Sequence, residues 1–100
     1  MRLVLASLVV ATLAACGPIQ STAALIDADV ELEAARAAGA AQAAPYEFAG
    51  AEAHLRKARE LEGRAEYETS VRLAGKALAL AKEARKHAVA ASNKDRETTP

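Results

Sequence analysis

The sequence has few of the residues that build disulfides, metal centres or aromatic binding sites. Among its 100 residues are one cysteine, no tryptophan, two tyrosines and one phenylalanine. A single cysteine excludes an internal disulfide, and three aromatic side chains add little bulk to a hydrophobic core. The 13 basic and 13 acidic residues balance, so the chain lacks the positive charge typical of nucleic-acid-binding proteins. We therefore expect closely packed helices and no nucleic-acid partner.

Motifs of catalysis and nucleotide binding are also missing. The two histidines, His54 and His87, are far apart in the sequence, and neither belongs to a His-Glu-x-x-His or cysteine-rich set of zinc ligands. No serine lies in the glycine-flanked turn that exposes a nucleophile. No glycine is followed by the Lys-Ser or Lys-Thr of a phosphate-binding loop. The sequence predicts neither an enzyme nor a metal or nucleotide cofactor.

Residues 1–15 have the three parts of an export signal. Arg2 is the charged start, residues 3–13 are the apolar middle, and Ala14 and Ala15 are the small residues before a cleavage point. The apolar run is about half of the roughly 20 residues that a helix needs to span a bilayer. We predict a signal peptide that is removed by cleavage between Ala15 and Cys16.

The four residues Leu13-Ala14-Ala15-Cys16 are similar to the lipobox of bacterial lipoproteins. That resemblance implies a diacylglycerol joined to the Cys16 sulfur by a thioether and a further acyl chain on its amine. One acyl chain anchors only marginally, whereas two or three bind a membrane stably. Gly17 stands where an aspartate would resemble an inner-membrane retention signal, which favours the periplasmic face of the outer membrane. An ordinary signal peptide followed by an incidental cysteine is the alternative.

The rest of the chain predicts an all-α fold because alanine, glutamate, leucine, lysine and arginine, all good helix formers, dominate it. Ser21 and Thr22 are candidate N-caps, Pro45 suits the first position of a helix, and Gly63 suits a helix end. Short connections favour antiparallel packing, so we predict a three-helix bundle. The predicted segments are a lipidated N-terminus and linker at 16–21, helices at about 22–42, 46–62 and 66–92, and a polar tail at 93–100.

Apolar positions at three-and-four spacing define the face that each helix is expected to bury. They are Leu25, Ala28, Leu32 and Ala35, widened by Ile26 and Val30, in the first helix; Phe48, Ala51, Leu55, Ala58 and Leu61 in the second; and Tyr67, Val71, Ala74, Leu78, Ala81, Ala84 and Ala88 in the third.

A longer resemblance covers residues 23–88. It is carried by Ala35-Arg36-Ala37-Ala38-Gly39-Ala40, by Ala44-Pro45-Tyr46, by Ala53, Leu55 and Ala58, by Tyr67 and by the alanines at 74, 77, 81 and 84. This pattern resembles the short bacterial lipoproteins grouped as domain-of-unknown-function family 4398. The chain departs from that family at Ala65-Glu66-Tyr67, where Gly-Asp-Tyr is usual, and at Ser70, where alanine is usual. The resemblance implies an envelope lipoprotein without an established activity.

The second and third predicted helices are also similar to a single tetratricopeptide unit, in which small residues such as Ala58 and Ala77 let two helices nest. Repeats of this kind normally need about three copies to bury a continuous core, and one copy is visible. The hairpin is either a peptide-binding groove or a pair of helices that only packs on the first helix.

Charge is unevenly distributed along the chain. Acidic residues lie early in the first predicted helix, from Asp27 to Glu33, whereas Lys82, Arg85 and Lys86 lie near the end of the third. Helix dipoles alone favour this arrangement. If Cys16 is anchored, however, the acidic end would face the membrane and the basic end would face outward. Lys82, Arg85 and Lys86 are therefore a candidate surface for an envelope protein or peptidoglycan.

These features together favour a lipid-anchored, non-enzymatic envelope lipoprotein acting as an adaptor or structural element. The alternative is a coiled-coil spacer similar to the major murein lipoprotein, which joins the outer membrane to the cell wall. That family is attached through a C-terminal lysine, whereas this sequence ends in Thr98-Thr99-Pro100. Gly39, Pro45 and Gly63 also interrupt any continuous heptad pattern.

Overall fold

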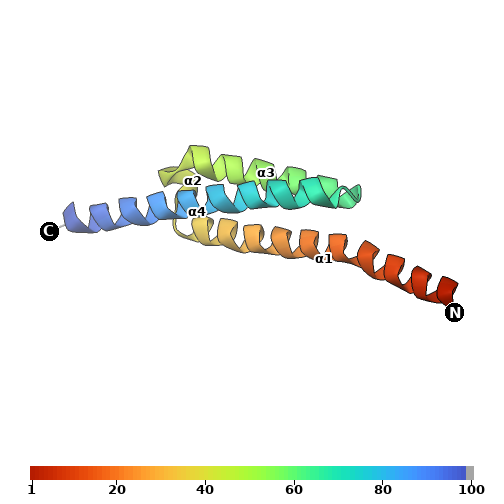
Figure 1. Cartoon of the computed structure of the whole chain (residues 1–100). Helices are drawn as coiled ribbons and strands as arrows, with labels where there is room; N and C mark the ends of the chain where they lie inside the picture. Colours follow the sequence, from red (N-terminus) through yellow and green to blue (C-terminus); the bar gives the residue numbers. More distant parts are fainter. Residues whose placement is uncertain (99–100) are drawn as a thin grey trace.

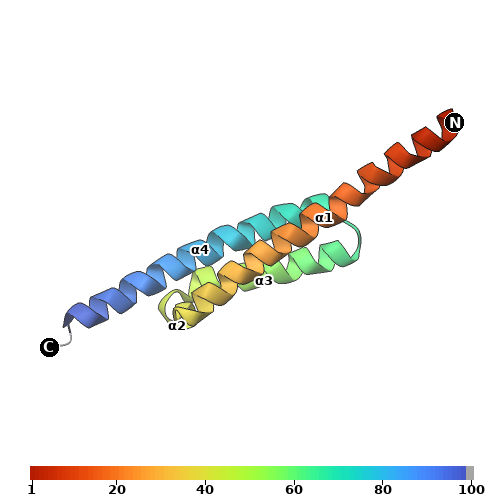
Figure 2. The ribbon, with the colours of Figure 1, turned by 90° about the horizontal axis from the view of Figure 1, so that it is seen from below.

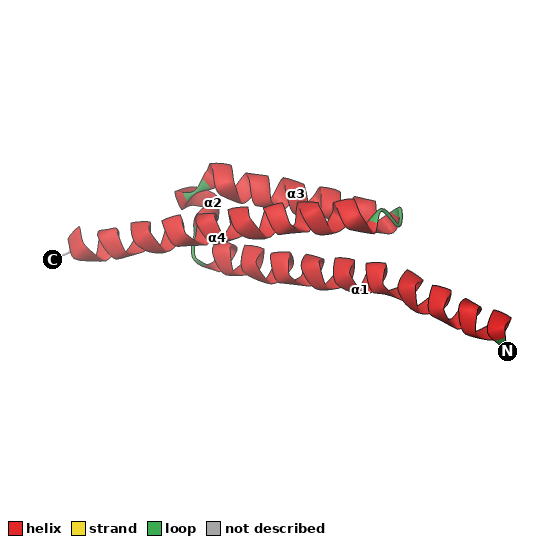
Figure 3. Cartoon of the chain, viewed as in Figure 1, coloured by secondary structure: helices red, strands yellow, loops and turns green. Residues whose placement is uncertain are grey.

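The structure, a computed structural model, describes residues 1–98, and it describes the side chains of that range except those of residues 12–16. The elements are α1 (Arg2–Ala37), α2 (Ala40–Ala43), α3 (Pro45–Gly63) and α4 (Tyr67–Thr98). Within residues 1–98 there is no strand (Figure 3). The all-α prediction is confirmed.

The long helices lie side by side in an elongated helical bundle measuring 77 × 19 × 14 Å. α1 and α4 run in the same direction and α3 runs in the opposite one (Figures 1 and 2). α4 packs along both α1 and α3, which contact each other much less. The first half of α1 and the last turns of α4 extend past opposite ends of the bundle (Figure 2).

Alanine makes up most of the core. All five core positions predicted in α3 are buried, and Ala28, Leu32 and Ala35 are buried in α1. In α4 the buried face differs from the predicted one, because three of the predicted core residues, Tyr67, Val71 and Leu78, are only partly buried. The buried positions of α4 are Ser70, Ala74, Ala77, Ala81, Ala84 and Ala88. Small side chains allow helix axes to approach closely, so the face that α4 shares with two neighbours is its alanine face.

Two predicted features of α1 are wrong. Ile26 and Val30 do not widen the core, since they are 57% and 64% exposed. Ser21 and Thr22 are not N-caps, because α1 begins at Arg2 and runs without a break through residues 16–21, where a linker was expected. The alanine- and leucine-rich residues before Cys16 favour a helix, and they continue it into the bundle.

Two predicted helix ends also differ from the structure. α1 ends at Ala37 rather than near Gln42, because Gly39 has a left-handed φ of 85° that no helix interior adopts. Residues 40–43 then form the separate short helix α2. At the other end, α4 continues to Thr98 where a polar tail was expected. The Thr98 hydroxyl donates to the carbonyl oxygens of Lys94 and Asp95, at 3.3 and 3.0 Å, which closes that last turn.

A pair of buried serines joins all three long helices. The Ser21 hydroxyl of α1 donates to the Ser70 Oγ of α4 at 3.1 Å, and the Ser70 hydroxyl donates to the Ala58 carbonyl oxygen of α3 at 2.8 Å. Both serines are 0% exposed. Because this chain of hydrogen bonds fits one axial alignment only, it helps to set the register of the three helices.

Replacing Ser70 with alanine should lower the free energy of unfolding by about 1 to 2 kcal/mol, because the Ser21 hydroxyl then loses its buried acceptor. Urea unfolding followed by circular dichroism measures this change. The double variant Ser21→Ala/Ser70→Ala should cost less than the sum of the single variants, since it leaves no unpaired hydroxyl. Ser92→Ala at an exposed position of α4 is the control. Strict additivity of the two serine variants would contradict the coupling.

The turn between α3 and α4 places a non-glycine residue in the left-handed region. Ala65 has φ of 61°, while Gly63, which the sequence indicated as the helix end, is the last residue of α3. The Glu66 amide donates to the Leu61 carbonyl oxygen at 2.9 Å, and the Ala65 amide donates to the Glu62 carbonyl oxygen at 2.9 Å. The left-handed residue that closes this turn is thus two positions after the glycine.

Substituting Ala65 with glycine should raise the free energy of unfolding by about 0.5 to 1 kcal/mol, because glycine adopts positive φ without a Cβ clash. Thermal or urea unfolding measures the gain. Ala79→Gly, at an exposed helical position of α4, is the matched control and should lose about 1 kcal/mol. A destabilising Ala65→Gly would rule out the left-handed conformation.

Candidate functional site

The predicted lipid-attachment residue, Cys16, lies within α1 close to the α3–α4 turn. The side chains of residues 12–16 lie outside the described residues, so the predicted cleavage point between Ala15 and Cys16 is placed by the α1 backbone alone. The next residue, Gly17, faces the Tyr67 ring at the start of α4. A Cβ at position 17 would lie 3.1 Å from Tyr67 Cδ2. The absence of a side chain at Gly17 therefore lets α1 pass close to the turn.

An open cavity of about 670 Å³ lies beside this contact. Gly17 and Gln20 of α1 line one side of it, and residues 65–69 with Val71 line the other. Glu66 and Glu68 give the second side an acidic rim. Among the residues whose side chains the structure describes, there is no group of three histidine, cysteine, aspartate or glutamate side chains able to hold a metal ion.

Pro18 lies inside α1, two residues after Cys16. A proline lacks an amide hydrogen, and its ring clashes with the carbonyl of the residue four positions earlier. In a helix interior these two effects cost about 3 kcal/mol or more. The full-length α1 therefore carries an unfavourable residue at the point where the predicted mature chain begins.

The candidate partner surface on α4 is exposed, but one of its three basic residues forms an ion pair within the molecule. Lys82, Arg85 and Lys86 lie on adjacent turns of α4 and are all exposed. Arg85 Nε contacts Glu31 Oε1 of α1 at 2.6 Å, so Arg85 links two helices. Within the described part of the chain, neither Lys82 nor Lys86 forms an ion pair. The two lysines are therefore the residues of this surface with charge available to a partner.

Acidic side chains lie close to the basic surface of α4, which the sequence predicted to be a basic end of the bundle. His87 lies between Glu47 and Glu83, with nitrogen-to-oxygen distances of 3.6 and 3.7 Å. α4 also extends beyond Lys86 for several more turns (Figure 1). The basic residues consequently lie along the side of α4 rather than at an end of the molecule.

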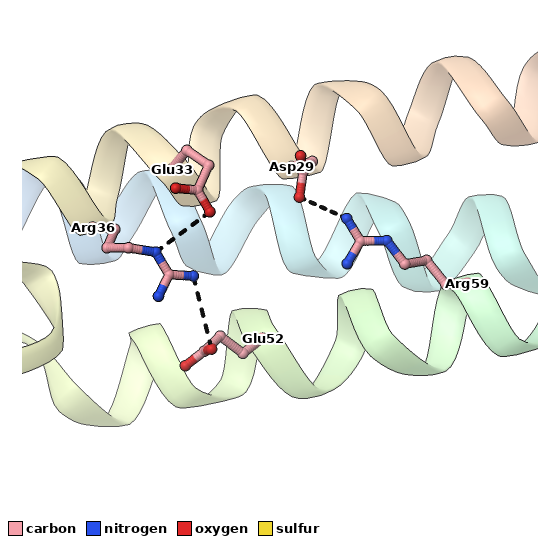
Figure 4. A network of polar contacts seen from close by, with 5 residues as sticks. All are labelled: Asp29, Glu33, Arg36, Glu52 and Arg59. Carbon is pink, nitrogen blue, oxygen red and sulfur yellow. Dashed lines mark hydrogen bonds and ion pairs between the residues drawn. The ribbon is translucent and has the colours of Figure 1, made fainter.

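Ion pairs span the groove between α1 and α3, which sequence reasoning did not predict (Figure 4). Arg59 of α3 contacts Asp29 of α1 at 2.6 Å, and Arg36 of α1 lies 3.4 Å from Glu33 and 3.9 Å from Glu52 of α3. The Arg36 guanidinium also lies 5.2 Å from the centre of the Phe48 ring.

This charged groove has a structural role. Its side chains are about half exposed, and exposed ion pairs contribute up to about 1 kcal/mol each. They bridge the two helices that share little apolar contact, and so they close the open side of the bundle. The pairs between helices, Asp29 with Arg59 and Arg36 with Glu52, join residues far apart in the sequence, which no local spacing indicates.

Other potential reactive groups are dispersed or covered. Ser21 and Ser70 are fully buried, and His54 and His87 lie on different helices, α3 and α4. A separate question is whether a helix could span a membrane. Among the described residues, no helix combines the length and the hydrophobicity needed to cross one.

No protein-family model, curated protein or solved structure matches this chain. Membership of domain-of-unknown-function family 4398 therefore stays a prediction from the sequence.

Proposed function

We propose that this chain is a bacterial lipoprotein that is exported, cleaved before Cys16 and anchored through acyl chains on that cysteine. The observation that carries the proposal is the position of Cys16, which follows Leu13-Ala14-Ala15 at the end of a short apolar run. The anchored protein lies on the periplasmic face of the outer membrane, consistent with Gly17 in place of an aspartate. Its role is that of a non-enzymatic adaptor or structural element.

The position of Pro18 supports cleavage at this point. If the mature chain begins at Cys16, Pro18 becomes its third residue and lies in the first turn of α1. Amide hydrogens in a first turn have no partner within the helix, so proline is tolerated there. The residue that is unfavourable in the uncut helix is therefore acceptable in the processed one.

Replacing Cys16 with alanine should abolish incorporation of labelled fatty acid and release the protein from membranes, because the chain has no other cysteine to carry the lipid. Metabolic labelling and the mass of the N-terminal peptide measure the result. Persistent labelling of the Cys16→Ala variant would contradict the anchor.

Gly17→Asp and Gly17→Ala form a matched pair for the membrane assignment. Both add a Cβ against Tyr67, but only aspartate resembles the retention signal. Gly17→Asp should move the labelled protein to inner-membrane fractions, whereas Gly17→Ala should leave it in the outer membrane.

We also propose that the helices form an antiparallel three-helix bundle whose α3–α4 pair resembles a tetratricopeptide hairpin. The buried small residues Ala58 and Ala77 between these helices support this assignment. So does Gly50 of α3, where a Cβ would lie 3.1 Å from Leu80 of α4. α1 packs along α4 of this hairpin and to a smaller extent along α3, which favours a packing role over peptide binding.

For the partner, we propose peptidoglycan or an acidic envelope protein that binds through Lys82 and Lys86, with Arg85 at the edge. The two free lysines and their exposed position on α4 support this surface. Peptidoglycan carries carboxylates, and charge complementarity would steer such a polymer toward exposed ammonium groups.

Reversing both lysines, as Lys82→Glu/Lys86→Glu, should reduce co-sedimentation of the lipoprotein with isolated peptidoglycan several-fold at low salt. Binding assays over a range of salt concentrations measure this, since screening should weaken the parent in the same way. Arg72→Glu/Lys76→Glu changes the net charge equally on exposed positions of the same helix and should bind like the parent. Equal losses in both variants would indicate a general charge effect instead.

A spacer between outer membrane and cell wall is the second candidate function. The elongated arrangement of α1, α3 and α4 favours it, although the longest axis of 77 Å includes residues 1–15, which the proposed cleavage removes. The reversal of the chain between α1 and α3 disfavours a continuous coiled coil, because a spacer of that kind needs one uninterrupted helix.

A further inference from the structure

α1 has a second apolar face that the bundle does not cover. Its residues are Ile19, Ala23, Ile26 and Val30, which we call the outer strip. The three large side chains are 69%, 57% and 64% exposed in that order, and Ala23 is also exposed. Successive spacings of four, three and four residues place the strip on one side of a helix. The opposite side holds Ala28, Leu32 and Ala35, which are buried.

The outer strip is in register with the predicted lipid-attachment position. Cys16 precedes Ala23 by seven residues, and Ala23 precedes Val30 by seven. Seven residues are close to two turns of an α-helix, and α1 is continuous over this range. The backbone position of Cys16 therefore falls on the same side of α1 as the strip.

We propose that the outer strip rests on the membrane surface, so that the anchored bundle lies along the bilayer with α1 against the lipid. This inference rests on the proposed anchoring through Cys16. The lipid chains attached at position 16 would bring that side of α1 to the headgroup region, where Ile19, Ile26 and Val30 can enter the boundary of the acyl chains. Helices that bind membranes in this way bury one apolar face in the interface.

The charges beside the strip are compatible with a lipid surface. Asp29, Glu31 and Glu33 form ion pairs with Arg59, Arg85 and Arg36. These pairs leave Asp27, which is exposed and lies four residues after Ala23, as an acidic side chain at the edge of the strip without an ion pair among the described residues. The helix has no basic rim to select anionic lipids, so a zwitterionic surface fits the strip best.

The size of the strip favours lipid over a second copy of the chain. Three large side chains and one alanine cover much less than the roughly 800 Å² per partner of a stable protein interface. A tethered chain needs less apolar contact area than a free partner does, because the anchor already holds the strip at high effective concentration near the membrane. A small apolar surface can thus set the orientation of the bundle without supplying the affinity.

Single tryptophan variants test the orientation, since the sequence contains no tryptophan. The acylated protein is purified from membranes and placed in phosphatidylcholine vesicles with or without brominated acyl chains. Ile26→Trp should show blue-shifted fluorescence and several-fold stronger quenching by brominated lipid than Lys82→Trp on α4. Both positions are exposed in the bundle, so circular dichroism should show the parent's helix content in each.

The outcomes separate this inference from the proposed anchor. If mass spectrometry finds no acyl chain on Cys16, the anchor itself fails. If Cys16 is acylated but Ile26→Trp is quenched no more than Lys82→Trp, only the orientation is wrong. Blue-shifted fluorescence without lipid quenching, together with a dimer in sedimentation, would assign the strip to a second copy. Exchange of Ile19 and Val30 for serine should weaken quenching of Ile26→Trp while acylation persists.

Discussion

The close contact of α4 with both α1 and α3 is the interaction on which the rest of the structure depends. Its buried positions are almost all alanines, and methyl side chains let neighbouring helices approach closely. Each alanine removes little apolar area from water, so the contact has to be long. This requirement explains why α1, α3 and α4 run beside one another over many turns rather than crossing at steep angles (Figure 1).

A contact made of alanines fixes the axial alignment of two helices poorly, and polar groups in this bundle supply that alignment. Alanine faces look alike at every turn, so apolar packing alone would tolerate a shift of one helix along another. The Ser21, Ser70 and Ala58 hydrogen bonds fix the alignment inside the bundle. Near the surface, the contacts between Asp29 and Arg59 and between Glu31 and Arg85 connect α1 to α3 and to α4. Specificity therefore comes from a few polar contacts, while burial comes from the alanines.

Local spacing predicted the helical class and the buried face of α3, because those properties depend on neighbours within a few residues. It misplaced Ile26 and Val30, since an apolar residue at helical spacing can lie on either side of α1. It also assigned Ser21 to a cap, although its partner is Ser70, far along the chain. The contact of Gly17 with Tyr67 and the groove pairs of Arg36 and Arg59 arise from packing between helices. The regular spacing of Ile19, Ala23, Ile26 and Val30 was visible in the sequence, but the spacing alone did not distinguish this exposed side of α1 from its buried side.

The alanine core also limits which amino-acid substitutions the protein can accept. At positions such as Ala51, Ala74 and Ala81, which are fully buried, there is almost nothing to remove, so truncation leaves only small voids. Any enlargement, however, would force two helices apart along their whole length. The interior therefore accepts larger residues poorly, while glycine there costs about 1 kcal/mol of helix stability and serine requires a hydrogen-bond partner. Substitutions that enlarge a side chain are therefore accommodated on the outer faces of the helices rather than between them.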